Sequence, residues 1–310
     1  MTCLICGSLA YDTIMSFHGR FSDAILPDQL HKVNVAFLVP GMRREFGGTA
    51  GNIAHNLKLL GSEPRIMATI GVDGEPYLER LAELELSRRN VRTIKKAFTA
   101  QAFITTDIDG NQITAFHPGA MAMSHENKVA EAGEVKLAIV APDGRDGMVQ
   151  NAKDCAQQGI PFIFDPGQGL PMFNGDELLE FIDLATYVTV NDYEAELLVD
   201  RTGLMPREIA QRLSAFIITR GEMGAEIYTG DVVLDIPCVP AENIVDPTGC
   251  GDAFRAGLMH GIINDMDLLT CGRLGSLMGA IKISHQGGQN HKLVRAEIAE
   301  RFKQAFGYEI

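Results

Sequence analysis

Residues 246–262, Asp246-Pro-Thr-Gly-Cys-Gly-Asp-Ala-Phe-Arg-Ala-Gly-Leu-Met-His-Gly-Ile262, are the stretch from which the fold and the chemistry can be inferred. Before this stretch, Ile244-Val245 resembles the end of a short strand. After the glycines, apolar residues recur at Phe254, Leu258 and Ile262, which is the spacing of one helix face. The sequence therefore predicts a turn that opens a helix.

The two glycines of this turn, Gly249 and Gly251, allow the backbone to direct its N–H groups toward one point at the positive end of the helix. Such a turn is a ready site for phosphate. Asp252 follows at once and is placed to take a proton from a hydroxyl while the amides hold the negative charge that moves in phosphoryl transfer. The combination predicts a kinase, and the alternative is an ordinary glycine-rich turn with Asp252 as a helix cap.

The composition is that of a globular protein, with 310 residues, 46% hydrophobic and 22% charged. This length predicts one large domain with a smaller appendage. The net charge of -13 argues against nucleic acid as a partner, because phosphate backbones are bound by clustered Lys and Arg. The chain shows neither a signal peptide nor 18 consecutive apolar residues, so we expect a soluble, cytoplasmic protein without a membrane partner.

Short apolar runs alternate with helical segments along most of the chain. Four of them cover residues 137–141, 161–165, 187–191 and 215–219. Strands separated by helices predict an α/β fold with a doubly wound, mostly parallel sheet that is covered on both faces.

Two other segments do not follow this rhythm. Residues 13–46 are irregular, with an alternating stretch at 32–39, and residues 100–106 and 112–116 flank Asp109-Gly-Asn111, which is a hairpin signal. We expect these segments, about 13–46 and 98–118, to form a small β lid inserted into a single domain of residues 1–310.

Polar residues follow several of the predicted strands. Asp12 is expected at the tip of a loop after the first strand, and Asp165-Pro-Gly-Gln168, Asn191-Asp-Tyr-Glu194 and Thr219-Arg-Gly221 follow three later ones. Ligands of parallel sheets collect beyond the carboxyl ends of the strands. These residues and the Asp252 turn are therefore expected to form one site.

With these motifs the chain resembles the ribokinase family, also called the PfkB carbohydrate and nucleoside kinases, over essentially its whole length. Gly47-Gly-Thr-Ala-Gly-Asn52 matches the first family motif, and Asp246 to Leu258 matches the second. Thr219-Arg-Gly-Glu-Met-Gly-Ala225 resembles the nucleotide-binding strand end of the family. The chain departs from the family at Cys250, where the family usually has Ala or Gly.

The resemblance implies Asp252 as the catalytic base and the amides of Gly249, Cys250 and Gly251 as an anion hole. At such a place, a thiol is expected to have some thiolate character. The resemblance also implies ATP as the phosphate donor, bound at a set of residues that comprises Asn191, Thr219, Gly221, Gly249 and Gly251.

Two kinds of cation are implied as well. Asn191 and Glu194 would organise Mg²⁺, largely through water, since hard cations prefer oxygen ligands. The alternative is that Glu194 is an ordinary acid in the first turn of a helix. In relatives a monovalent cation such as K⁺ often lies behind the anion hole. Here it would be held by carbonyls near Asp246 and Thr248 and by a later loop, Ser284-His-Gln-Gly-Gly288.

The acceptor site is implied to contain Asp12, Gly48 and Asn52, which would bind sugar hydroxyls, together with Phe116 and Gln168. Apolar residues of the two lid segments suit the stacking of a base, and these residues are Met15, Phe17, Phe37, Leu38, Phe103, Ile113 and Phe116. The same surface also suits a lid core or a homodimer contact.

The sequences of residues 113–121, 164–171 and 190–196 resemble bacterial nucleoside kinases. We therefore expect transfer of phosphate from ATP to the 5′-hydroxyl of adenosine or a related nucleoside. The alternatives are a sugar kinase acting on a furanose, and a relative that binds nucleotide only as a sensor.

Overall fold

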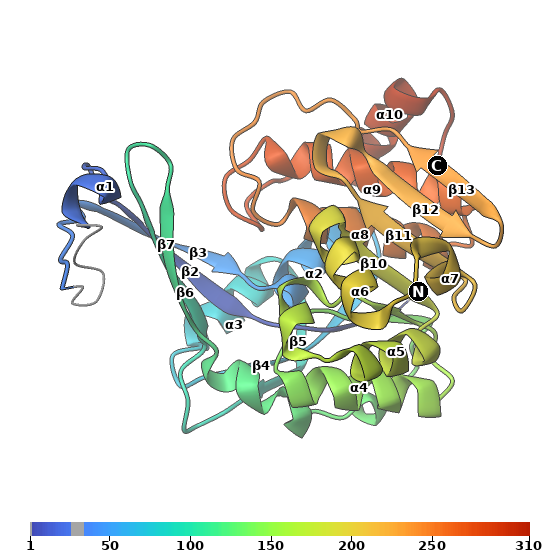
Figure 1. Cartoon of the computed structure of the whole chain (residues 1–310), viewed down its shortest axis with the longest axis horizontal. Helices are drawn as coiled ribbons and strands as arrows, with labels where there is room; N and C mark the ends of the chain where they lie inside the picture. Colours follow the sequence, from blue (N-terminus) through green and yellow to red (C-terminus); the bar gives the residue numbers. More distant parts are fainter. Residues whose placement is uncertain (1, 26–33) are drawn as a thin grey trace.

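The computed structural model describes residues 2–25 and 34–310, and this part of the chain forms two β-sheets (Figure 1). The main sheet has nine strands, in the spatial order β13 (Val232–Ile236), β12 (Ala225–Thr229), β11 (Ala215–Thr219), β10 (Tyr187–Asn191), β9 (Phe162–Phe164), β8 (Leu137–Val140), β1 (Thr2–Cys6), β4 (Glu63–Ile70) and β5 (Ser87–Thr93). The second sheet has the order β3 (Gly41–Gly47), β2 (Ala10–Ser16), β6 (Ala100–Thr106) and β7 (Gln112–His117).

Neighbouring strands of the main sheet run parallel from β5 to β11, and β12 and β13 extend it antiparallel at one edge. The four apolar runs expected as strands are β8, β9, β10 and β11, with bounds that differ from the expected ones by at most one residue. The predicted doubly wound, mostly parallel sheet is therefore confirmed.

Helices cover both faces of the main sheet. One face carries α2 (Thr49–Leu59), α3 (Glu75–Glu83), α8 (Cys250–Ile263) and α9 (Leu268–Ile283), and the other carries α4 (Arg145–Gln157), α5 (Gly175–Leu184), α6 (Asp192–Thr202) and α7 (Pro206–Ala210). The helix α10 (Arg295–Phe306) packs on α9, and α1 (Phe21–Ala24) lies beside the second sheet. Short 3₁₀ helices complete the connections: η2 (Gly119–Glu126), η3 (Val129–Ala132), η4 (Gly167–Met172) and η5 (Gly221–Met223). No helix in the described part of the chain is long and apolar enough to cross a membrane.

The strand β1 shows why the parallel strands read as continuous apolar runs. Cys3 and Ile5 belong to the core beneath α2 and α8, whereas Leu4 and Cys6 belong to the core beneath α4 and α5. All four side chains are fully buried. A strand that is buried on both faces needs apolar residues at every position.

The helices α8 and α9 approach each other closely. A Cβ atom on Gly257 would lie only 2.6 Å from the amide nitrogen of Gly275, so the two backbones touch where these glycines meet. This contact holds α8, whose first turn is the predicted anion site, against the helix that follows it in the chain.

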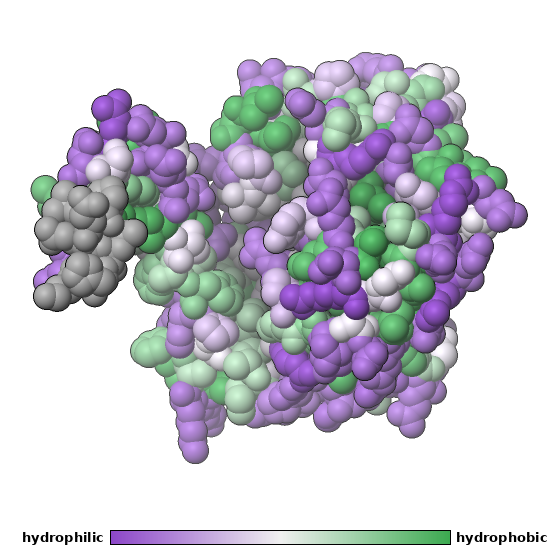
Figure 2. Space-filling model, in the orientation of Figure 1, coloured by the Kyte–Doolittle hydropathy of each residue, from purple (hydrophilic) through white to green (hydrophobic). Residues whose placement is uncertain are grey.

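The second sheet extends away from the main body, with α1 at its far end (Figure 1). Figure 2 shows a hollow in the surface between this sheet and the main body. The hairpin expected between residues 100 and 116 is confirmed as the antiparallel pair β6–β7. In the alternating stretch 32–39, residues 34–39 form no strand, whereas residues 32 and 33 lie outside the described residues. The strand of this region lies instead at Gly41–Gly47.

The pairing of strands sorts the second sheet into two faces. Asp12 pairs with Ala102, which pairs with Phe116, so these three residues share one face. Thr13 pairs with Phe103 on the opposite face. The apolar residues that the sequence offers for base stacking are thus divided between the two faces.

Candidate active site

The predicted strand ends meet at one edge of the main sheet. β9 ends beside Asp165, β10 ends at Asn191 and β11 ends at Thr219. Charges of Asp165 and Arg255 act on both Glu194 and Asp252, so the first turns of α6 and α8 belong to the same cluster. The parallel sheet therefore brings together residues that are more than 80 positions apart in the chain.

Asp246 shapes the turn that precedes α8. Its two carboxylate oxygens accept hydrogen bonds from the amides of Thr248 and Gly287, each at 2.9 Å. Burial alone would raise the pKa of Asp246, but these amide bonds outweigh it and lower the pKa. Asp246 is thus an ionised residue that joins the turn to the 284–288 loop.

The first turn of α8 leaves backbone amides without partners. Gly249 has φ +80°, a left-handed conformation that favours glycine, and no side chain caps the helix. Among the described residues, the N–H groups of Gly249, Gly251 and Asp252 have no hydrogen-bond acceptor. The amide of Cys250 differs from the prediction, because it donates to the carbonyl of Pro247 at 3.2 Å.

The Asp252 carboxylate lies at this open helix end. Its Oδ2 accepts a hydrogen bond from Nδ2 of Asn52, at 2.8 Å. Burial raises the pKa of Asp252 to about 6, against the opposing effects of the Asn52 bond and of the charges of Arg255 and Lys282. A carboxylate with a pKa close to neutral is suited to act as a general base.

Arg255 and Asp165 form a buried ion pair under Asp252. The Nη2 of Arg255 donates to Oδ1 of Asp165 at 2.7 Å, and the two residues are only 6% and 1% exposed. A Cβ atom on Gly251 would approach the guanidinium to 2.8 Å, so Gly251 leaves room for this side chain. The sequence analysis did not single out Arg255. A charged residue among the apolar residues of a buried helix is a signal from which its role could have been predicted.

Asp12 lies in the middle of strand β2 and not at the tip of a loop, as the sequence suggested. The prediction was wrong because the second sheet begins at Ala10, immediately after the turn that leaves β1. Burial raises the pKa of Asp12 to about 6, and the negative charges of Asp246 and Asp252 act in the same direction. Asp12 thus lies close enough to the α8 turn for the charges of Asp246 and Asp252 to act on it.

A chain of hydrogen bonds joins Asp252 to the second sheet. The Oδ1 of Asn52 accepts from Nε2 of Gln289 at 3.2 Å, and the same Nε2 lies 2.8 Å from the hydroxyl of Tyr77. That hydroxyl donates to the carbonyl of Gly47, the last residue of β3, at 2.6 Å. Gly48 follows with φ +85°, and a Cβ there would lie 2.5 Å from the Ser8 carbonyl oxygen.

Asn191 and Glu194 form a capping box at the start of α6. The Asn191 side chain accepts from the Glu194 amide at 2.7 Å, and Oε2 of Glu194 accepts from the Asn191 amide at 2.8 Å. Burial raises the pKa of Glu194. Glu194 is therefore a first-turn acid that caps α6, and its Oε1 has no partner among the described residues.

Four further residues belong to the predicted site. Thr219 is partly buried and donates to the Val190 carbonyl at 3.3 Å. Gly221 is exposed, with φ +55° and open space around its Cβ direction. Gln168, in η4, and Phe116, in β7, are also exposed. The Gln168 side chain forms no hydrogen bond within the described chain.

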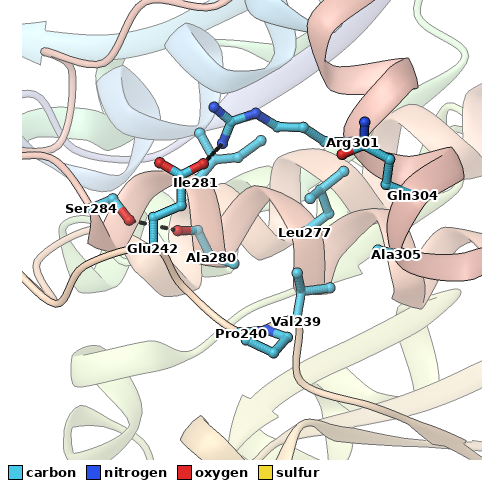
Figure 3. Close-up of a pocket in the computed structure, with 10 residues that line it drawn as sticks. All are labelled: Val239, Pro240, Glu242, Leu277, Ala280, Ile281, Ser284, Arg301, Gln304 and Ala305. Atoms are coloured by element: carbon cyan, nitrogen blue, oxygen red, sulfur yellow. Dashed lines mark hydrogen bonds and ion pairs between the residues drawn. The ribbon is translucent and has the colours of Figure 1, made fainter.

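The predicted monovalent cation group is only partly assembled. The Ser284 hydroxyl donates to the carbonyl of Asn243 at 3.0 Å and approaches that of Ala280 at 3.4 Å, and thus does not face the α8 turn. Figure 3 shows Ser284 lining a different pocket, of about 270 Å³, between α9, α10 and residues 239–242. The Ser284 hydroxyl is therefore no ligand of the predicted cation site, for which the sequence implied carbonyls.

The thiol of Cys250 does not have the expected thiolate character. Burial raises its pKa to about 11, although the positive charge of Lys282 acts in the opposite direction. The unpaired amides of the turn thus do not compensate for the loss of water around the sulfur.

A carboxylate at an open, glycine-rich helix end, located beyond the carboxyl ends of a doubly wound parallel sheet, defines a phosphotransferase that acts on an alcohol group. The family model described as "pfkB family carbohydrate kinase" matches residues 10–294. The chain belongs to this family.

Relatives match almost the entire chain. A nucleoside kinase from Methanothermobacter thermautotrophicus is 30% identical over 310 residues, which cover 96% of this chain and 97% of the relative. The structure of Burkholderia thailandensis nucleoside kinase in complex with inosine is 58% identical, with a TM-score of 0.91 and 99% of each chain covered. The structure of the same enzyme in complex with ADP-inosine has a TM-score of 0.88 and 60% identity, over 99% of this chain and 97% of that one.

Proposed function

We propose that this protein transfers the γ-phosphoryl group of ATP to the 5′-hydroxyl of a purine nucleoside. The observation that carries the proposal is the Asp252 carboxylate, held by Asn52 beside unpaired amides at the start of α8. The 58% identical nucleoside kinase in complex with inosine, and its complex with ADP-inosine, support a nucleoside as acceptor and ATP as donor.

In this mechanism Asp252 accepts the proton of the acceptor hydroxyl. The hydroxyl oxygen forms a bond to the γ-phosphorus, the bond from that phosphorus to the oxygen of the β-phosphate breaks, and ADP leaves with the electron pair. The amides of Gly249, Gly251 and Asp252 would stabilise the charge on the transferred group, because they have no acceptor within the described chain and are held at the start of α8. Arg255 contributes positive charge below the carboxylate without touching the reacting atoms.

The donor would lie along the ends of β10 and β11, against Asn191, Thr219 and Gly221. The exposed left-handed backbone at Gly221 offers an approach without a side chain. Mg²⁺ would be held mainly by the phosphates and water, with Oε1 of Glu194 in reach of a water ligand. No group of three or more His, Cys, Asp or Glu side chains suited to a metal occurs in the described residues. When bound, Mg²⁺ neutralises phosphate charge.

The acceptor would lie between the second sheet and α8. Asp12 supplies carboxylate oxygens that accept hydrogen bonds from ribose hydroxyls, and Asn52 is held beside the base Asp252. Phe116 shares the face of Asp12, two strands away, and presents a ring that is 51% exposed. Gly48 and Gln168 complete the proposed set. The purine would cover the ring of Phe116.

The proposal is tested by measuring ADP release with adenosine, inosine, ribose, fructose and no acceptor. We expect turnover with at least one purine nucleoside and little with the free sugars. Turnover with ribose alone would assign a sugar kinase instead, and ATP binding without any turnover would assign a nucleotide sensor.

Two phenylalanines provide a matched pair for the acceptor site. Phe116→Ala should raise KM for the nucleoside about three- to tenfold, since an aromatic contact contributes about 1 kcal/mol. Phe103→Ala removes an equally large ring from the opposite face of the same sheet and should leave KM within about twofold. An equal effect of the two variants would contradict the assignment of the Phe116 face.

The opposite face of the second sheet supports the proposal of a homodimer. Met42, Phe103 and Ile113 are exposed there by 72%, 40% and 41%. A second copy would cover this apolar face. Light scattering distinguishes a dimer from a monomer. We expect a dimer for the parent and a monomer for Ile113→Asp, because the new charge disrupts the apolar contact.

A further inference from the structure

A buried lysine lies behind the candidate anion site. Lys282, in the last turn of α9, is 0% exposed and is the only buried lysine in the described part of the chain. A buried ammonium is costly unless hydrogen bonds and negative charge surround it. Its surroundings therefore indicate what it does.

Two backbone carbonyls accept hydrogen bonds from this ammonium. The Nζ of Lys282 donates to the carbonyl of Asp246 at 2.8 Å and to that of His285 at 3.0 Å. One carbonyl belongs to the turn that leads into α8, and the other to the 284–288 loop. These are the two segments that would supply oxygen ligands to a monovalent cation.

These residues do not fit K⁺. Two carbonyl oxygens of these segments, those of Asp246 and His285, are already bonded to Nζ. An ion bound to them would have to displace the Lys282 side chain from a fully buried position. The Ser284 hydroxyl is bonded to the carbonyls of Asn243 and Ala280 and supplies no further oxygen ligand. The prediction of a K⁺ site at Asp246, Thr248 and Ser284 is therefore corrected.

We propose that the ammonium of Lys282 takes the place of a monovalent metal cation behind the anion site, so that donor binding and turnover in this protein do not depend on K⁺. This inference rests on the proposed kinase function. The ammonium carries one positive charge, donates to carbonyls that would otherwise coordinate the ion, and is attached to α9. It therefore joins the α8 turn to the 284–288 loop at any salt concentration.

The charges around Lys282 agree with this role. Burial lowers the pKa of Lys282, whereas the neighbouring Cys250, Asp246 and Asp252 favour the charged form. In return, the positive charge of Lys282 favours the ionised form of Asp252. Lys282 touches none of the reacting atoms, so it is a positioning residue.

The first experiment uses the parent protein. The Kd for ADP with Mg²⁺ is measured by calorimetry in buffers without alkali metal, and KCl is then exchanged for tetramethylammonium chloride at constant ionic strength. We expect the Kd to change by less than about twofold and the Tm of the ADP complex to change by less than about 1 °C. A saturable, K⁺-specific tightening of fivefold or more would overturn the proposal. Because this measurement needs no acceptor, it is independent of the test of the nucleoside.

The second experiment removes the ammonium. Lys282→Ala should weaken ADP binding by roughly tenfold or more and make it respond to KCl, which can enter the space left by the side chain. Lys282→Met fills that space without a charge, and K⁺ should not restore the affinity for ADP that this variant loses. Lys153→Met, on the surface of α4 where Lys153 pairs with Glu180 at 2.9 Å, is the control and should behave as the parent.

These variants separate a positioning role from a merely structural one. A structural loss in Lys282→Ala would be insensitive to the identity of the added cation, and that result, or parental affinity in the variant, would contradict the proposal. If neither variant folds, the K⁺ titration of the parent still decides the question.

Discussion

Two helices begin at the same edge of the main sheet, and their first turns are built in opposite ways. At α6, the side chains of Asn191 and Glu194 occupy the backbone amides of the helix start, and each accepts a hydrogen bond from the other residue. At α8, Gly249 has no side chain to offer, and no cap closes the helix. The amides of Gly251 and Asp252 remain unpaired within the described chain.

The comparison contrasts a helix start that is closed for stability with one that is left open at the proposed anion site. A helix start has partial positive charge and unpaired N–H groups in both cases. The capping box of α6 uses them to stabilise the helix, typically by about 1 kcal/mol. The open start of α8 forgoes that stabilisation and keeps the same groups for an anion. An acid in the first turn therefore has a different role at each helix.

The largest expected effect compares an acid at each helix start. Asp252→Asn should lower kcat about 10²–10⁴-fold, because the amide cannot accept the proton, while ADP and nucleoside still bind. Asp192→Asn makes the same change in the first turn of α6, at an exposed residue, and should leave kcat within about twofold. Steady-state kinetics and calorimetry provide the two readouts. Turnover of the Asp252 variant within about tenfold of the parent would remove its assignment as the base.

The pH dependence of the reaction follows from the burial of the same carboxylate. Burial raises the pKa of Asp252 to about 6, and the protonated form below that pH cannot accept a proton. We therefore expect kcat/KM to be constant above about pH 7 and to fall as the pH drops through 6. Burial also raises the pKa of Asp12 to about 6. Since Asp12 must be ionised to accept hydrogen bonds and Asp252 to accept the proton, the fall should be steeper than for one proton.

This profile can be checked with a single substitution. Asp12→Asn should bring the slope of the logarithmic profile back toward one, at the cost of a higher KM. A pH profile of the parent that stays flat down to pH 5 would show that neither carboxylate has the raised pKa that the structure indicates.

A smaller effect separates the cap of α6 from a role in metal binding. Glu194→Gln keeps an oxygen that can accept from the Asn191 amide, so the Tm should change little, whereas the half-saturating Mg²⁺ concentration should rise roughly tenfold. Asn191→Ala removes the cap, which typically costs about 1 kcal/mol, and should lower the Tm by a few degrees. If Glu194→Gln leaves the Mg²⁺ dependence unchanged, Glu194 is only a cap.

The smallest expected effect concerns the first residue of α8. Because burial raises the pKa of Cys250 to about 11, iodoacetamide should modify this thiol slowly at pH 7.5, and Cys250→Ser should keep kcat within about twofold. Peptide mapping over time gives the rate of modification. Rapid alkylation of Cys250 that ATP prevents would instead support the thiolate character that the sequence suggested.

The parts of the fold that were predicted from the sequence are those in which local pattern and burial agree. β8, β9, β10 and β11 are continuous apolar runs because both of their faces are covered. β5 was missed, since Ser87-Arg-Arg-Asn-Val-Arg-Thr93 is an edge strand with polar and charged residues and has no such run.

The limits at the candidate site have a similar origin. The sequence pointed to Asp252, Asn52 and Asp12 because their motifs are local. It could not show that the pleat places Phe116 on the same face as Asp12 and Phe103 on the opposite face, because that depends on the register of β2, β6 and β7. Nor could it place Lys282, whose role depends on carbonyls 36 residues before it and three residues after it.

The hydrogen-bonded chain from Asp252 to Gly47 would connect a movement of β3 to the orientation of the Asp252 carboxylate. Asn52, Gln289 and Tyr77 connect the carboxylate to the end of β3, and every link is directional. A displacement of β3 toward an arriving acceptor would pull on the Tyr77 hydroxyl and thereby reorient the oxygen that removes the proton. Such a displacement would couple the alignment of the carboxylate to occupancy of the proposed acceptor site, and an empty site would leave the carboxylate out of line for transfer to water.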